Sequence, residues 1–351
     1  MKQTFWKKRG GPVRPLPSKN TLDRRLDHYR HTIALPAIEI ETAAALKLHE
    51  FIAIKERVLG SNLALYRCVK PEETTAADVL ELCHQVGLKR LDRGSATNVA
   101  GLTQLKVTQS SLKRYVPYTS RELNWHTDGY YNPVHRRIRG MLLHCVVAAA
   151  AGGTNEFLDH EIVYTLLHHA DPAYPIALCR HDAMTIPANR DAVNGYREAR
   201  SGPVFWRSSG QLNMRYTSRR QHIIWRDDPL TREAVAALGE ILSERSDLIL
   251  RRRLKPGEGV LCNNVLHRRD AFENALLESG NRLFYRGRFH DSLISQPASA
   301  LAPELNEIML QNPLESTDPD RFLPLLGNVV DVLVPNDRGI DRKLIQVSLP
   351  H

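Results

Sequence analysis

The sequence lacks any apolar stretch long enough to cross a membrane. No run within its 351 residues approaches the roughly 18–20 apolar residues of a spanning helix. The N-terminus also lacks the short apolar segment of a secretory signal peptide. Hydrophobic residues make up 42% of the chain and charged residues 25%, as in ordinary globular proteins. We therefore expect a cytoplasmic protein with no membrane partner.

Cysteine is also scarce, and its spacing excludes two kinds of site. The five cysteines are Cys68, Cys83, Cys145, Cys179 and Cys262. Their number is odd, and no two of them form a C-x-x-C pair. This argues against a disulfide framework and against a zinc finger, and it favours a reducing compartment.

Positive charge is concentrated near the N-terminus. The net charge is +9, and residues 1–31 hold nine Lys or Arg against only Asp23 and Asp27. Because this segment also contains several Pro and Gly, we expect a basic, extended and flexible arm. Such an arm could contact nucleic acid. A solvated leader is favoured, because no nucleic-acid-binding fold signature accompanies the charge.

The central part of the chain is rich in strand patterns. Strand character appears at 62–69, 102–108, 140–153, 203–218, 254–269 and 281–291, and helical character at 42–58, 74–87, 160–171 and 228–244. Many strands separated by turns, with few helices among them, predict a mainly β protein with helical decoration.

Two H-x-D motifs could contribute metal ligands. His126 and Asp128 lie in "ELNWHTDGYY", and His169 and Asp171 lie in "LLHHADPAY". Side chains two apart on a strand point to the same face, so a strand end can present both groups to one ion. The second motif ends an expected helix just before Pro172, which is a helix-stop context. We therefore interpret the second motif as structural.

A non-haem iron site needs a third ligand. Fe(II) oxygenases bind the metal with two imidazoles and one carboxylate on one face, which leaves the other positions open. His267 is the candidate, because it follows a turn and an apolar strand in "PGEGVLCNN". A 2-oxoglutarate co-substrate would need a bidentate cation for its far carboxylate, which favours Arg over Lys. Arg282 follows on the next expected strand.

Five stretches in order resemble the taurine dioxygenase and γ-butyrobetaine hydroxylase family of iron(II)/2-oxoglutarate oxygenases. They are "LNWHTDGYYN", "MLLHCVVAAAAGGTNEFLDHEIVYTLL", "LNMRYTSR", "KPGEGVLCNNVLHRRDAF" and "NRLFYRGRFHD". The resemblance implies a double-stranded β-helix (jelly-roll) core. By position it also implies iron bound by His126, Asp128 and His267, 2-oxoglutarate paired with Arg282, and Arg286 as a second active-site arginine.

The resemblance suggests a division of the chain into four parts. We expect the basic arm at 1–31, a helical and strand-containing part at 32–100 that packs on the core, and the catalytic jelly roll at 101–295. Residues 296–351 form an extension without an assigned role.

One departure from the family pattern concerns the co-substrate. The family usually has Gly-Gly-acid-Thr where this chain has Gly152-Gly153-Thr154-Asn155. The contact to 2-oxoglutarate could come from Thr154 in a shifted register, or from the amide of Asn155, which can donate to a carboxylate. Both alternatives stay open at this point.

Several other residues are candidates for substrate contact. One of Tyr130 and Tyr131 should face the pocket, because neighbouring residues on a strand alternate. Arg215 and Tyr216 match a family stretch near the substrate. His144 is expected to be a core or strand-face histidine.

The resemblance implies that the enzyme hydroxylates a small-molecule substrate, or cleaves it after hydroxylation, with O₂ consumed and succinate and CO₂ released. The retained Asp128 favours hydroxylation, because halogenating relatives replace this carboxylate. Two alternatives stay open: a nucleic-acid-binding or nucleic-acid-modifying protein, and a metal-binding jelly roll without turnover. The sequence also leaves a homo-oligomer open.

Overall fold

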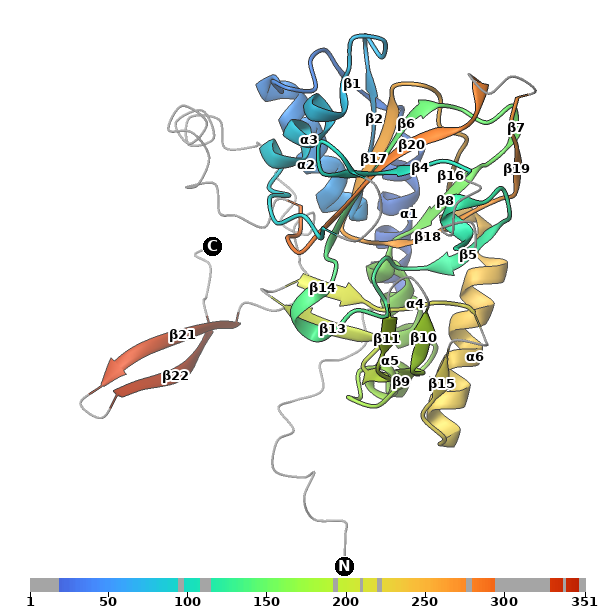
Figure 1. Cartoon of the computed structure of the whole chain (residues 1–351). Coiled ribbons are helices and arrows are strands. Elements are labelled where there is room, and N and C mark those ends of the chain that lie inside the picture. The colour runs from blue at the N-terminus through green and yellow to red at the C-terminus, as the bar shows by residue number, and fades with distance from the viewer. Residues whose placement is uncertain are drawn as a thin grey trace, which may run out of the picture. The chain divides into compact units, whose positions relative to one another are not determined.

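Two β-sheets packed face to face form the centre of the chain (Figure 1). The computed structural model describes residues 19–93, 98–107, 115–191, 195–208, 211–219, 223–275, 280–293, 329–336 and 339–346. The chain divides into two units, residues 1–296 and 297–351. Both sheets belong to the first unit.

The larger sheet has the strand order β1-β2-β17-β6-β20-β4-β3. Its strands are β1 (Ile38–Ile40), β2 (Leu63–Cys68), β3 (Asn98–Val99), β4 (Leu102–Leu105), β6 (Gly140–Val147), β17 (Glu258–Cys262) and β20 (Leu283–Phe289). All neighbouring strands are antiparallel except β1 and β2. Strands from the N-terminal and C-terminal parts of the unit, such as β2 and β17 or β4 and β20, are therefore hydrogen-bonded neighbours, which is typical of a jelly roll.

The smaller sheet has the order β16-β8-β18-β5 and is antiparallel throughout. Its strands are β5 (Leu123–His126), β8 (Asn155–Leu158), β16 (Leu250–Arg252) and β18 (Leu266–Arg269). This sheet brings the two histidines of the expected metal site together, because β5 and β18 are hydrogen-bonded neighbours.

The larger sheet is buried on both faces. On β6, Met141 and Leu143 pack toward the smaller sheet together with Phe157. Leu142, on the opposite face, packs under the helices α2 (Leu48–Ser61) and α3 (Ala76–Gln85). A strand covered on both faces has no polar face, which explains the continuous apolar run "GMLLHCVV".

A second helical layer covers the far side of the smaller sheet. It contains α4 (His160–Ala170), α5 (Ala173–Leu178) and α6 (Pro229–Glu244), and its core also includes residues of α1 (Lys19–Ala34). The predicted start of α6 is confirmed: Asp228 caps the helix by accepting from Thr231 N at 3.0 Å.

Short strand pairs and two-residue strands complete the first unit. The pairs are β7 (Ala151–Gly152) with β19 (Phe272–Glu273), β10 (Asn189–Asp191) with β11 (Gly195–Arg197), and β13 (Phe205–Ser208) with β14 (Gln211–Met214). A separate three-stranded sheet contains β9 (Met184–Ile186), β12 (Arg200–Gly202) and β15 (Ile224–Trp225). In the second unit, β21 (Val329–Asn336) pairs with β22 (Gly339–Gln346). None of the described helices is both long and apolar enough to cross a bilayer.

The structure corrects the expected extent of the basic arm. Helix α1 begins at Lys19, within the segment expected to be extended as far as residue 31. Leu22, Leu26 and Tyr29 place three apolar side chains on one face at helical spacing, and all three are buried. The sequence analysis missed this helical pattern because it relied on the high Lys and Arg content of the segment. Residues 1–18 lie outside the described residues.

Candidate metal centre

Two neighbouring strands bring three candidate ligands together. His126, the last residue of β5, lies directly opposite His267 of β18, and the centres of the two imidazole rings are 4.2 Å apart. Asp128 follows two residues after β5. One ligand atom from each of the three side chains lies within 4.8 Å of the others. Two imidazoles and one carboxylate converging on one point are the donor set of a non-haem Fe(II) site.

Each histidine is oriented by a backbone carbonyl. Nδ1 of His126 lies 2.9 Å from the carbonyl of Asn124, and Nδ1 of His267 lies 2.9 Å from that of Val265. A carbonyl can only accept, so Nδ1 carries the proton and Nε2 keeps its lone pair for a metal. Burial, together with the neighbouring His267, lowers the pKa of His126 to about 3. Burial also lowers the pKa of His267, so both rings are neutral at neutral pH.

Asp128 is a buried carboxylate with an incomplete set of partners. Burial by itself raises the pKa of Asp128, but Arg286 and then His267 outweigh it and hold the pKa below its usual range. Oδ1 lies 3.4 Å from Nη1 of Arg286. Oδ2 is buried and has no hydrogen-bond partner among the described residues. A buried, unpartnered carboxylate oxygen beside two neutral imidazoles fits a metal cation.

The loop that carries Asp128 is held by a residue that the sequence analysis missed. Asn264 accepts from the backbone N–H of Asp128 at 2.8 Å and donates to the Asp128 carbonyl at 3.0 Å. It also donates to the carbonyl of Ile138 at 2.9 Å. Asn264 adopts a left-handed backbone (φ 46°), which Asn tolerates better than most residues. An Asn two residues after the end of an apolar strand and three residues before His267 was the available signal.

A hollow between the two sheets adjoins the metal site. It encloses about 460 Å³, part of it open to solvent. Its lining includes His126 and His267, apolar side chains from both sheets, and the polar residues Asn155, Arg268, Arg269, Arg282 and Arg286. The hollow is therefore lined by apolar side chains and by four arginines, which suits an anionic ligand.

Arg282 is the most deeply buried cation of this hollow. Its residue is 2% exposed, and its guanidinium lies over the rings of Phe284 at 3.8 Å and Phe272 at 4.9 Å. Burial, followed by the charge of Arg269, lowers its pKa to about 9. No described carboxylate forms an ion pair with Arg282. A buried guanidinium without a counter-ion is costly, and a carboxylate ligand would offset that cost.

The two alternatives for the Gly-Gly-Thr-Asn segment differ in position. Asn155 is buried in β8 and lines the hollow. Its side-chain amide lies 3.4 Å from the carbonyl of Gly153. Thr154 does not line the hollow, and its carbonyl accepts from Asp270 N at 3.0 Å. This placement favours Asn155 as the residue that reaches a bound co-substrate.

The predicted substrate residues are placed in different surroundings. Tyr130 and Tyr131 lie beside the ligand loop, with their rings edge to face at 5.1 Å. Arg215, predicted near the substrate, donates from its guanidinium to the carbonyls of Met184, Gly202 and Arg200. It lies outside the hollow and joins three backbone segments, so its position is that of a structural support.

Tyr216 reaches the site through its backbone. Its ring packs in the helical core next to Trp225, at 6.4 Å between centres. Its N–H donates to Oγ1 of Thr127 at 3.0 Å, and its carbonyl accepts from Thr127 N at 2.9 Å. This backbone pair fixes the residue between His126 and Asp128.

The other histidines follow the structural interpretation. His169 and Asp171 lie at the end of α4, where Asp171 accepts from Ala173 N at 2.7 Å, and they belong to no metal-binding group among the described residues. His144 is buried on the helix-covered face of the larger sheet, with Nδ1 3.0 Å from the hydroxyl of Tyr66. Its expected role as a core histidine agrees with this position.

A family model described as taurine catabolism dioxygenase TauD, TfdA family matches residues 37–287. The chain belongs to this family. The match covers the smaller sheet, the larger sheet except the last two residues of β20, and all three candidate ligands. The family assignment makes the protein a 2-oxoglutarate-dependent non-haem iron dioxygenase that uses Fe(II), 2-oxoglutarate and O₂. It oxidises a small molecule and releases succinate and CO₂.

Solved structures with the same fold share little sequence with this chain. A single-residue mutant of the non-haem iron oxygenase OrfP, in complex with (3S)-hydroxy-L-Arg, is 15% identical with a TM-score of 0.53. OrfP in complex with Fe is 13% identical with a TM-score of 0.51. Each comparison covers 78% of this chain and 92% of the other. These matches confirm the jelly-roll fold.

An asparagine oxygenase in complex with Fe(II), 2S,3S-3-hydroxyasparagine and succinate is 14% identical, with a TM-score of 0.47. That comparison covers 82% of this chain and 96% of the other. A search of curated proteins finds no match.

Proposed function

We propose that His126, Asp128 and His267 bind the catalytic Fe(II). The observation that carries this proposal is the convergence of their three ligand atoms within 4.8 Å. Two properties support it: both histidines have Nε2 free and neutral, and Oδ2 of Asp128 is buried without a partner. Arg286 keeps Asp128 ionised, so the carboxylate is ready to bind a cation at neutral pH.

We also propose that the hollow binds 2-oxoglutarate with its far carboxylate at Arg282. Arg282 offers two parallel N–H donors at a buried position, which is the geometry that a carboxylate prefers. Asn155 would donate to the same ligand from β8. Arg286 lies between the hollow and Asp128, so it would orient the metal-binding end of the co-substrate.

The bound iron and 2-oxoglutarate would supply the oxidising chemistry, and the protein would supply orientation and exclusion of water. The apolar side chains that line the hollow would limit the water beside the iron once the ligands are bound. Since Asp128 is retained, no ligand position is vacated for a halide. We therefore propose hydroxylation of a small molecule, or cleavage that follows hydroxylation, as the outcome.

A cytoplasmic location is proposed on the state of the cysteines. All five are free thiols, and four of them are buried. Free thiols persist in a reducing compartment.

The test compares the two H-x-D motifs. His126→Ala, Asp128→Ala and His267→Ala should each abolish Fe(II) binding, measured by anaerobic titration, and 2-oxoglutarate-dependent succinate formation. His169→Ala, a matched histidine outside the site, should leave both measurements near wild type. Iron binding that survives in His126→Ala and disappears in His169→Ala would overturn the assignment.

A further inference from the structure

The strand that ends in His126 contains a β-bulge. Strand β5 pairs with β18 so that His126 lies opposite His267, but before the next pair of the ladder β5 advances by three residues and β18 by two. Asn124 and Trp125 therefore lie together opposite Arg268. A bulge of this kind bends a strand and re-aims its side chains, and it is common next to functional sites.

The bulge decides which side chains of β5 reach the hollow. In a regular strand Asn124 would point to the same side as His126, because residues two apart share a face. With the extra residue, Leu123 takes this place and lines the hollow with His126, while Asn124 is exposed. A bulge shifted by one residue would turn other side chains inward. Its position therefore sets where His126 lies relative to His267.

The contact between this bulge and β18 is made by a side chain. The extra residue of a bulge is left unpaired in the ladder, so backbone hydrogen bonds hold it incompletely. The guanidinium of Arg268 lies over the indole of Trp125, 5.1 Å from the ring centre, and a cation is attracted to this face. The carbonyl of Trp125 accepts from Ser218 N at 2.8 Å. That bond ties the bulge to the segment after β14, whereas Arg268 ties it to the strand that carries His267.

A buried carboxylate fixes the plane of this guanidinium. Glu156 lies directly opposite Arg268 on β8, and its side chain is only 6% exposed. Nε and Nη2 of Arg268 donate to its two oxygens at 3.0 and 3.1 Å. Two parallel bonds orient a planar guanidinium more strictly than one bond does. Although Arg268 borders the hollow, its guanidinium is thus engaged by Glu156 and Trp125.

These contacts belong to a row of side chains that crosses the four strands of the smaller sheet (Figure 1). The row consists of Trp125, Arg268, Glu156 and Arg251. Its first three members are chain neighbours of His126, His267 and Asn155, which line the hollow. Since the members of the row alternate with these residues along the strands, the row acts on them through the backbone. We call Trp125, Arg268 and Glu156 the clamp.

We propose that the clamp positions the two histidine ligands. Arg268, oriented by Glu156, holds the bulge through the indole of Trp125 and thereby keeps His126 at the distance from His267 that one metal ion requires. The clamp acts through the strands, so its members are positioning residues. This inference rests on the proposed function, because it takes both histidines as ligands.

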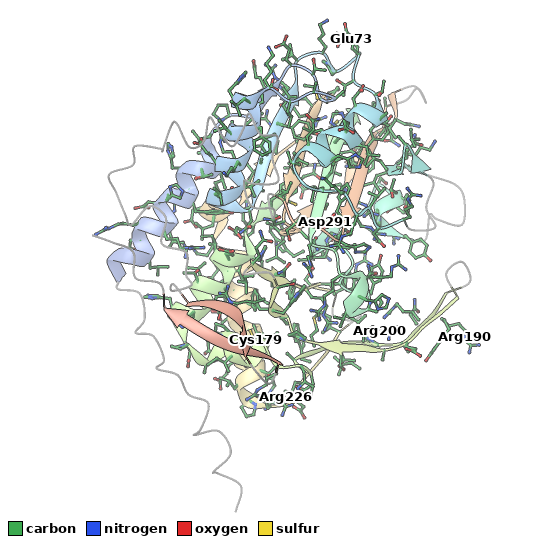
Figure 2. The ribbon with its side chains drawn as sticks, turned by 90° about the vertical axis from the view of Figure 1, so that its left-hand side faces the viewer. Glu73, Cys179, Arg190, Arg200, Arg226 and Asp291 are labelled. Atoms are coloured by element: carbon green, nitrogen blue, oxygen red, sulfur yellow. The ribbon has the colours of Figure 1, made fainter. Side chains whose placement is uncertain are left out.

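The row provides a matched control. Arg251 pairs with the same carboxylate, with Nε 3.4 Å from Glu156, but it lies on β16 and its side chain is 46% exposed. Arg251→Ala removes a cation from Glu156 and keeps the contact between Arg268 and the indole. Arg190→Ala is a second control, because it removes an arginine from the outer part of the β10–β11 ribbon, as Figure 2 shows.

The first experiment uses Co(II) as the probe, because its visible absorption depends on the geometry of its ligands. Arg268→Met and Arg268→Lys should each weaken Co(II) binding about 10–100-fold and change the spectrum. Lys keeps the charge but lacks the planar fork. Arg251→Ala and Arg190→Ala should keep the affinity and the spectrum of the wild type. Wild-type behaviour of both Arg268 variants, or an equal loss in Arg251→Ala, would overturn the proposal.

A conservative substitution tests the role of the ring. Trp125→Phe keeps an aromatic face for Arg268, and Trp125→Leu removes it. The Phe variant should bind Co(II) more tightly than the Leu variant, with a spectrum closer to that of the wild type. Equal affinity and equal spectra in the two variants would contradict a contact through the ring. Should Trp125→Leu fail to fold, the Arg268 variants decide.

The last measurement needs no metal and separates the two proposals. In metal-free protein, hydrogen exchange of residues 122–127 should be at least about 2-fold faster in Arg268→Met than in Arg251→Ala. Equal exchange in these variants would sink the clamp alone. Metal binding that is unaffected by His126→Ala would sink the proposed function, while the exchange rates still report on the clamp.

Discussion

At the scale of single residues, each proposed iron ligand depends on a neighbour that orients it. Backbone carbonyls fix the tautomers of His126 and His267, and Asn264 holds both the N–H and the carbonyl of Asp128. A supporting residue of this kind sets the geometry of a site without touching the reactants. Replacing such a residue should therefore weaken metal binding more than it lowers the stability of the fold.

Asn264→Ala should weaken Fe(II) binding about 10–100-fold. The substitution removes the bonds that place Asp128, and it puts Ala into a left-handed backbone. Anaerobic Fe(II) titration measures the affinity. Asn263→Ala is the matched control, because the Asn263 side chain bonds to Asn62 and to the N–H of Leu293 instead. Equal Fe(II) affinity in the two variants would show that Asn264 does not position Asp128.

Arg282→Ala should raise the 2-oxoglutarate concentration needed for half-maximal succinate formation by at least about 30-fold, since a lost charge-assisted contact costs about 2–5 kcal/mol. Fe(II) binding should persist, because Arg282 does not contact the ligands. Arg232→Ala, on the exposed face of α6, serves as a control. An unchanged 2-oxoglutarate requirement in the Arg282 variant would refute its assignment.

At the scale of elements, the larger sheet contains a titratable group in its helix-covered layer. His144 of β6 lies between the rings of Tyr66 and Tyr285 and is almost completely buried. Burial lowers the pKa of His144 to about 4. The folded state therefore keeps this histidine neutral at pH values where an unfolded chain protonates it.

This difference makes stability depend on pH in a defined direction. Below the unfolded pKa of about 6.5, the unfolded chain binds a proton that the folded chain does not. Stability is thus lost as pH falls from about 6.5 to about 4, by up to about 1.4 kcal/mol per pH unit for one group. Chemical denaturation between pH 7.5 and 5 should show a shallower loss in His144→Gln than in wild type. Parallel curves for the two proteins would contradict this origin.

At the scale of the whole molecule, helix α1 joins the basic N-terminal segment to the core of the first unit. Its residues Leu22, Leu26 and Tyr29 are buried against the helical layer, and Arg30 pairs with Asp247 at 2.8 Å. The hydroxyl of Tyr29 also accepts from the N–H of Asp159 at 3.1 Å, just before α4. The segment therefore contains a structural part that begins at Lys19.

Two truncations separate the structural part from the charged residues before it. Removing residues 1–18, with five Lys or Arg and no acid, should leave succinate formation and the melting temperature near wild type. Removing residues 1–34 also deletes three buried apolar side chains, Leu22, Leu26 and Tyr29, each contributing about 1.5–3 kcal/mol. Since total stability is about 5–15 kcal/mol, the longer truncation should lower the melting temperature strongly. Turnover that disappears already with the shorter truncation would favour a nucleic-acid-modifying enzyme.

The features that the sequence alone determined are local. The helix over 228–244 and the helix stop at Pro172 each depend on residues within a few positions. The choice of His126 and Asp128 over His169 and Asp171 was also local, because a helix end before proline differs from a strand end. His267 and Arg282 could be proposed because the order of motifs along the chain resembles that of a known family.

Only the tertiary structure shows which distant residues hold these side chains in place and which charged side chains have no described ion-pair partner. Asn264 and Asp128 are 136 positions apart, so no local pattern could show that one holds the other. The guanidinium of Arg215 binds carbonyls up to 31 positions away, which turns a predicted substrate residue into a support. Only the tertiary structure shows that no described carboxylate forms an ion pair with the buried Arg282. Whether a charge is paired depends on which distant segments fold beside it, and burial then sets how much an unpaired charge costs.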